Sequence, residues 1–163
     1  MRRRRKIAGR YLSVSVFCFG IHAASVLLEP FAFQLGGDGI TKAGYLAGTI
    51  FWLGWLGGIL FFWLAWHMMH QSTVYQEQKK KMLPGILAFF RTKGARRIDS
   101  IWIAALLISI LGNLWVKVPN TLTLIAMSIT LFMFYLHMIV NGRVYRYMIS
   151  NERKERKREE GED

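Results

Sequence analysis

One stretch, GYLAGTIFWLGWLGGILFFWLAW at residues 44–66, decides the fold. It carries no charged side chain, and as a helix it is long enough to cross the ~30 Å hydrocarbon core of a bilayer. Three more apolar stretches lie at residues 11–28, 100–116 and 121–140. We therefore predict an all-α integral membrane protein. Residues 1–142 are expected to form a four-transmembrane-helix bundle, and residues 143–163 a charged tail.

Charged residues and apolar residues occupy different segments of the chain. The net charge is +12 although the mean hydropathy is +0.24. Of 22 Lys and Arg, six precede the first span, seven lie in the central connection and seven in the tail, whereas the two outer connections hold only Lys42 and Lys117. The positive-inside rule then predicts a multi-pass protein of the plasma membrane, with both termini and the central loop in the cytoplasm.

The basic residues of the central connection are expected to face anionic lipid headgroups. Attraction to lipid accounts for the high positive charge, so no nucleic acid is expected as a partner. The residues in question are Lys79, Lys80, Lys81, Arg91, Lys93, Arg96 and Arg97.

The central loop also predicts a short amphipathic helix at the membrane interface. Leu83, Ile86, Leu87 and Phe90 recur at helical spacing, and Pro84 suits a first helical turn. The alternative is a solvated loop. Farther along, Asn141–Tyr147 places aromatics and arginines after the fourth span, which indicates an interfacial anchor or, alternatively, a lipid-headgroup or partner-docking site.

The N-terminal stretch has an alternative interpretation as a secretory signal cleaved near Ala23, Ala24 and Ser25. Its apolar character continues past that point and three more spans follow, which favours an uncleaved first helix. Glu29-Pro30 is expected to end or kink that helix.

Polar side chains fall on one stripe of three spans when each is drawn as a helix at about 100° per residue. Such stripes should face each other or a cavity, because polar groups facing lipid lack partners. They could serve only as interhelical glue, on the order of 0.6 kcal/mol per hydrogen bond. The stripe residues are Ser15, Cys18, His22, Ser25, Glu29, Ser109, Asn113, Thr123, Thr130, His137 and Asn141.

The second span offers glycines instead. Gly44/Gly48 and Gly54/Gly58 both have GxxxG spacing, which lets a neighbouring backbone approach closely. We expect this face to pack against another helix.

Ionisable residues within spans are functional candidates by default. His22 could relay a proton or, with Glu29, bind a cation. The structural alternatives are a neutral His22 bonded across the interface and a Glu29 at the outer water boundary.

Histidines His67 and His137 are predicted at similar depth near the cytoplasmic face, with His70 one turn from His67. Two histidines on facing helices could ligate a haem, and all three a metal ion, but no carboxylate partner is evident for them. We expect neither a cofactor nor a metal. Cys18 is the only cysteine, so an intramolecular disulfide and CxxC chemistry are excluded.

Three functional hypotheses follow. The first is a non-enzymatic accessory protein or subunit of a membrane complex, with a membrane-protein partner or further copies of itself. The second is an oligomeric small transporter or channel that uses His22 and Glu29. The third is a haem- or metal-binding redox carrier that uses His67 and His137. Enzyme activity is not favoured, because no hydrolase, phosphate-loop or dinucleotide motif occurs.

Overall fold

The structure is a computed structural model that describes residues 2–31, 40–82, 84, 89–90, 93–115 and 121–159. These residues form helices and no strand. The elements in chain order are α1 (Arg2–Ser25), the 3-10 helix η1 (Val26–Phe31), α2 (Lys42–His70), α3 (Thr73–Lys79), α4 (Lys93–Trp115), α5 (Thr121–Val140) and α6 (Arg143–Glu159).

Four of these helices are long and apolar enough to cross a membrane, in agreement with the prediction. They are α1 with η1, α2, α4 and α5. The predicted fourth span matches α5, whereas three helices extend past their apolar stretches. The basic run Arg2–Arg10 continues α1, and α4 begins at Lys93 rather than near residue 100.

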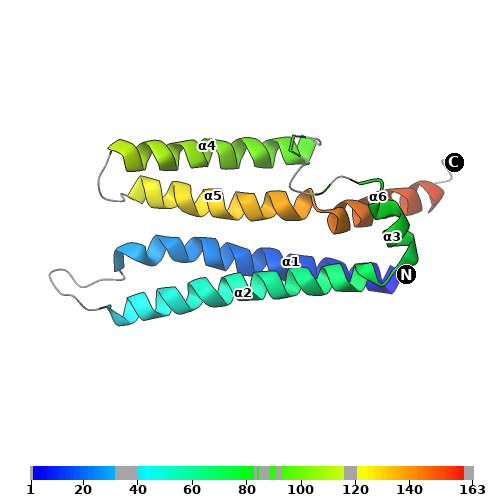
Figure 1. The fold of residues 1–163 in the computed structure, drawn as a ribbon, viewed down its shortest axis with the longest axis horizontal. Helices are drawn as coiled ribbons and strands as arrows, with labels where there is room; N and C mark the ends of the chain where they lie inside the picture. Colours follow the sequence, from blue (N-terminus) through cyan, green and yellow to red (C-terminus); the bar gives the residue numbers. More distant parts are fainter. Residues whose placement is uncertain are drawn as a thin grey trace.

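The long helices form two antiparallel hairpins, α1–α2 and α4–α5 (Figure 1). The hairpins join where α5 packs on α1, through the stacked rings of Phe19 and Tyr135 at 4.1 Å. Over the described residues, α4 packs extensively only against α5, and α2 has no extensive contact with α4. Both chain termini lie at one end of the molecule, beside α3 and α6.

The ends of the helices have local causes. The Thr41 hydroxyl accepts a hydrogen bond from the Gly44 N–H at 3.0 Å and caps α2, and Ser72 caps α3 in the same way. At the far end of α1, Pro30 lies inside η1. The α-helix ends at Ser25 and the chain continues as a 3-10 helix, in agreement with the inability of proline to continue the α-helical hydrogen bonds.

The hydrophobic core lies at the end that holds the termini. Leu12 of α1, Met69 of α2 and Ile139 of α5 are buried there together. Tyr75 of α3 and Tyr147 of α6 close the cluster with an edge-to-face contact at 5.2 Å. The two short helices are thus packed onto the bundle by aromatic burial.

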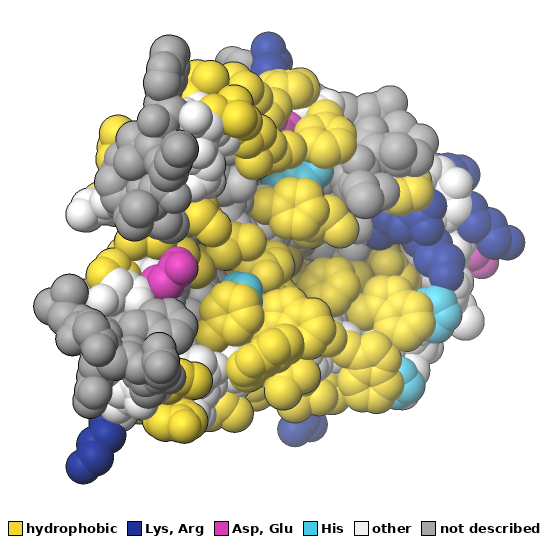
Figure 2. All heavy atoms as spheres, turned by 60° about the vertical axis from the view of Figure 1, so that its left-hand side comes forward, with side chains coloured by type: hydrophobic (Ala, Val, Ile, Leu, Met, Phe, Trp, Pro, Cys, Tyr) yellow, Lys and Arg dark blue, Asp and Glu magenta, His cyan; other side chains and the backbone are white. Residues whose placement is uncertain are grey.

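Large apolar side chains cover the outside of the helices (Figure 2). Leu114 is 78% exposed and Phe17 68% exposed. In this view most Lys and Arg gather at the right-hand side, away from the middle of the helices. Outward apolar faces of this extent are typical of helices that contact lipid.

The predicted interfacial helix is not found at the described residues of its segment. Leu83, Ile86 and Leu87 lie outside the described residues, while Pro84 and Phe90 are described and neither is helical. Phe90 was predicted to continue a helix, but it has a φ of 54° in a turn. Among the described residues of this connection, the helix is α3, which begins at Thr73 shortly after the end of α2.

Candidate functional site

A buried polar cluster joins α4 to α5 near the start of α4. His137 Nδ1 lies 2.5 Å from Asp99 Oδ1, and both side chains are completely buried. The side-chain amide nitrogen of Asn141, one turn after His137, lies 2.9 Å from the same Nδ1. Three of the most polar side chain types therefore meet inside an apolar helix pair.

The cluster also holds the end of the central loop. The Phe90 N–H donates to Asp99 Oδ2 at 2.7 Å, and the ring of Phe89 stacks on His137 at 4.3 Å. Phe90 adopts the left-handed region, which a residue with a bulky side chain rarely enters. A hydrogen bond to the carboxylate of Asp99 offsets that backbone cost.

Two side chains lie within hydrogen-bond distance of the same ring nitrogen of His137. A ring nitrogen offers either one proton or one lone pair, so Asp99 and Asn141 compete for His137 Nδ1. When Nδ1 carries the proton and donates it to Asp99, it cannot also accept a hydrogen bond from the Asn141 amide nitrogen. His137 Nε2 is also buried and has no hydrogen-bond partner among the described residues.

The polar stripe of α1 is satisfied mainly by backbone carbonyls. His22 Nδ1 donates to the Phe51 carbonyl at 2.9 Å, and its ring lies between Phe51 and Tyr135. Ser15 donates to the Gly58 carbonyl across the interface, and Ser25 to the His22 carbonyl in its own helix. His22 of α1 is therefore hydrogen-bonded to α2 and packed against rings of α2 and α5.

The remaining stripe residues differ in how deeply they are buried. Ser109 and Thr123 are buried, and Thr130 donates back to the Ala126 carbonyl. Glu29 and Asn113 are exposed, and Cys18 is half-buried. The structure thus does not bring Glu29 together with His22, nor Asn113 with the buried polar residues.

The two glycine pairs of α2 differ. A Cβ on Gly54 would lie 2.8 Å from the backbone nitrogen of His22, and a Cβ on Gly58 would lie 2.4 Å from the Phe19 ring. The helices α1 and α2 therefore cross in close contact at this pair. Gly48 is exposed, and a Cβ there would meet nothing within 4 Å.

The other two histidines lie on α2. His67 is exposed, stacks on Trp63 and accepts from the Gln71 amide at 3.0 Å. His70 stacks on Trp66. Neither shares the buried α4–α5 interface with His137. Over the described part of the chain, no three His, Cys, Asp or Glu side chains converge to hold a metal ion.

The basic residues of the central connection lie on its surface where they are described. Lys80, Lys81, Arg96 and Arg97 are exposed, and Lys79 is half-buried. Arg91 lies outside the described residues, and Lys93 begins α4.

Asp99 is the residue that sequence reasoning missed. No carboxylate partner for the histidines was expected, yet Asp99 is in contact with His137. The available signal was that Asp99, next to the third apolar stretch, falls within an arc of about 80° with Ser109 and Asn113 when the segment is drawn as a helix. What hid the pairing is that 38 residues separate the two, and sequence alone does not say which helices are neighbours.

Comparison with known proteins gives no relative to argue from: no family model, no curated protein and no solved structure matches the chain.

Proposed function

We propose that this chain is a non-enzymatic, multi-pass subunit of a plasma-membrane complex that holds the transmembrane helix of a partner protein. The observation that carries the proposal is the pair Gly44/Gly48, which we call the open glycine pair because both residues line surface hollows and Gly48 is exposed. The matching pair Gly54/Gly58 on the same helix is filled by α1, whereas a Cβ on Gly48 would meet nothing. The GxxxG spacing suits close helix–helix approach in lipid, where association relies on packing.

The open glycine pair lies between two apolar hollows. One, of about 440 Å³, has Gly44, Gly48 and Phe51 of α2 on one side and Met127 and Leu131 of α5 on the other. The second hollow, of about 480 Å³, includes Tyr45, Trp52 and Leu53 as well as both glycines. A helix seated over Gly44 and Gly48 would fill both hollows at once.

Glu29 suggests the chemistry of the partner. It lines the first hollow and is exposed at the end of η1. A carboxylate at the rim of an apolar groove is favoured when it faces a cation or a hydroxyl. We therefore expect small residues on the partner helix where it crosses Gly48, and a Lys, Arg, Ser or Thr at the level of Glu29.

Orientation follows from charge. The 20 Lys and Arg in the N-terminal, central and tail segments against two in the outer connections support cytoplasmic termini. Both termini lie at one end of the molecule, as this topology requires. The first hollow, which Gly44 and Glu29 both line, would then lie toward the outer leaflet.

The transporter hypothesis loses support from His22, because its Nδ1 donates to a backbone carbonyl and Glu29 lies apart from it. Gly44 and Gly48 offer no side-chain group that could bind a solute, so this surface favours docking of another helix.

The test is to purify the tagged chain from its native membrane in mild detergent, with Gly48→Leu as the variant. The matched control is Leu60→Trp, which adds bulk at another exposed position of α2 outside both hollows. Light scattering and mass spectrometry report the stoichiometry. We expect a stoichiometric second polypeptide with wild type and Leu60→Trp, and its loss with Gly48→Leu.

Two results would contradict the proposal: a monomeric wild type, or a partner retained by Gly48→Leu. A homo-oligomer that dissociates with Gly48→Leu would replace the partner protein by a second copy of this chain.

A further inference from the structure

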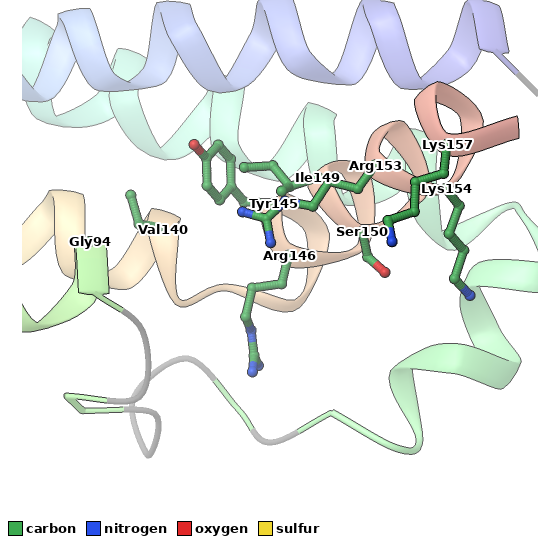
Figure 3. A pocket seen from close by; sticks show the side chains of 9 residues that line it. All are labelled: Gly94, Val140, Tyr145, Arg146, Ile149, Ser150, Arg153, Lys154 and Lys157. Atoms are coloured by element: carbon green, nitrogen blue, oxygen red, sulfur yellow. The ribbon is translucent and has the colours of Figure 1, made fainter. Parts of the chain in front are cut away.

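A basic hollow lies where the end of α5, the start of α4 and the face of α6 meet (Figure 3). Its volume is about 770 Å³. The residues that line it are Gly94, Val140, Tyr145, Arg146, Ile149, Ser150, Arg153, Lys154 and Lys157. From these residues we infer that the hollow is a binding site for the phosphate headgroup of one anionic glycerophospholipid.

The cations come from one face of α6. Arg146, Arg153, Lys154 and Lys157 follow a spacing of seven, one and three residues, which places them on one side of a helix together with Ser150. Four cations this close repel one another. An anion between them offsets that repulsion, and the planar fork of an arginine matches phosphate oxygens.

Glu152, an acidic residue of α6 whose side chain is described, lines a different hollow, with Arg5, Lys6 and Arg10 of α1. Among the described side chains, no carboxylate forms an ion pair with Arg153, Lys154 or Lys157. The helix α6 therefore turns a described acid toward α1 and a cluster of cations toward the start of α4.

The level of the hollow fits a lipid headgroup. Val140 is the last residue of α5 and Gly94 lies in the first turn of α4, so the hollow begins where two apolar helices end. Basic hollows at this level of a membrane protein suit anionic headgroups. A phospholipid has a charged headgroup and apolar acyl chains, so it can contact the basic hollow and the apolar helices at the same time.

The path for an acyl chain starts at Val140. At about 100° per residue, Leu122, Ile129 and Val140 share one face of α5 to within about 20°. Leu122 is 64% exposed and Ile129 38% exposed. An acyl chain can therefore lie along α5 while the phosphate binds the cations of α6. A free phosphate would contact only the cations of α6 and not the apolar face of α5.

The experiment measures binding of phosphatidylglycerol to the delipidated full chain in detergent by native mass spectrometry. Phosphatidylcholine with the same acyl chains is the neutral comparison. The variant is Arg153→Gln/Lys154→Gln, and the matched control is Lys80→Gln/Lys81→Gln, which removes the same charge from exposed positions at the same end of the molecule. Circular dichroism checks that each variant folds.

We expect phosphatidylglycerol to bind in preference to phosphatidylcholine. The hollow variant should bind it roughly 25-fold more weakly, since each of the two cations contributes about a fivefold factor near an anionic surface. The control should stay within twofold of wild type. Lys157→Gln alone should weaken binding by about fivefold, and it serves as the test should the double variant fail to fold.

Three results would overturn the inference. The hollow variant and the control could lose affinity equally, which would indicate general attraction to charge. Phosphatidylcholine could bind as well as phosphatidylglycerol. Glycerol phosphate at the same concentration could displace the lipid, which would make the hollow a site for a free phosphate. This experiment does not use the open glycine pair, so it stands apart from the proposed function.

Discussion

His137 of α5 and Asp99 of α4 form a buried pair, with Nδ1 and Oδ1 2.5 Å apart. The pair links the two helices through buried side chains, and it contacts the central loop through the Phe90 N–H. Removal of one partner leaves the other polar group buried without compensation. Removal of both leaves the Phe90 N–H and the Asn141 amide without these partners, but no unpaired ionisable side chain.

A double-mutant cycle on this pair should therefore show strong coupling. Asp99→Ala and His137→Ala are each expected to lower the free energy of unfolding by about 3–5 kcal/mol, and the double variant by clearly less than the sum. Thermal and denaturant unfolding in detergent measure this. Asn113→Ala, at an exposed position of the same helix, is the control and should change little. Additive losses would mean that the pair does not act as a unit.

The two glycine pairs of α2 should respond differently to a single methyl group. Gly54→Ala would push a Cβ against the backbone of α1 at 2.8 Å, so we expect a loss of about 1–3 kcal/mol. Gly48→Ala meets open space and should leave the isolated chain equally stable or up to about 1 kcal/mol more stable, because alanine favours helix. Denaturant unfolding of the purified monomer compares them. Equal losses would show that α1 does not cross α2 at Gly54.

Docking of α3 should weaken at alkaline pH. Burial raises the pKa of Tyr75 above its usual 10.0, and the nearby charge of Arg143 lowers it in part. As the pH rises past about 10, the unfolded chain loses the phenol proton first, so the contribution of Tyr75 to stability falls through the higher folded pKa.

Tyr75→Phe should remove this part of the pH dependence. The measurement is the difference in melting temperature between wild type and variant from pH 8 to 11. Tyr45→Phe, at a 66% exposed position, is the control and should follow wild type. A constant difference between wild type and Tyr75→Phe would argue against a buried neutral phenol.

Topology can be tested with single cysteines in a Cys18→Ala background. Arg3→Cys and Lys80→Cys lie at exposed positions predicted to be cytoplasmic, and Lys42→Cys at an exposed position predicted to be outside. A membrane-impermeant maleimide should label Lys42→Cys in intact cells, and the other two only after permeabilisation. The reverse pattern would show that the charge bias does not set the orientation.

The four long helices could be predicted because uninterrupted apolar stretches of spanning length have few other outcomes. The residues at which these helices begin and end could not be predicted in the same way. The helix α4 begins seven residues before the predicted span, in a segment whose cations give no hydropathy signal and whose buried Asp99 depends on α5. Likewise, the sequence holds two equivalent GxxxG pairs on α2, and only the position of α1 distinguishes Gly54/Gly58 from Gly44/Gly48.

The pairing of Asp99 with His137 also has a consequence for biogenesis. Asp99 is synthesised 38 residues before the histidine that it contacts, so α4 leaves the ribosome with a carboxylate whose partner does not yet exist. Placing that carboxylate in an apolar setting alone is costly, and the cost falls once α5 arrives. The hairpin of α4 and α5, rather than α4 by itself, is therefore the smallest unit in which Asp99 can be buried together with its partner.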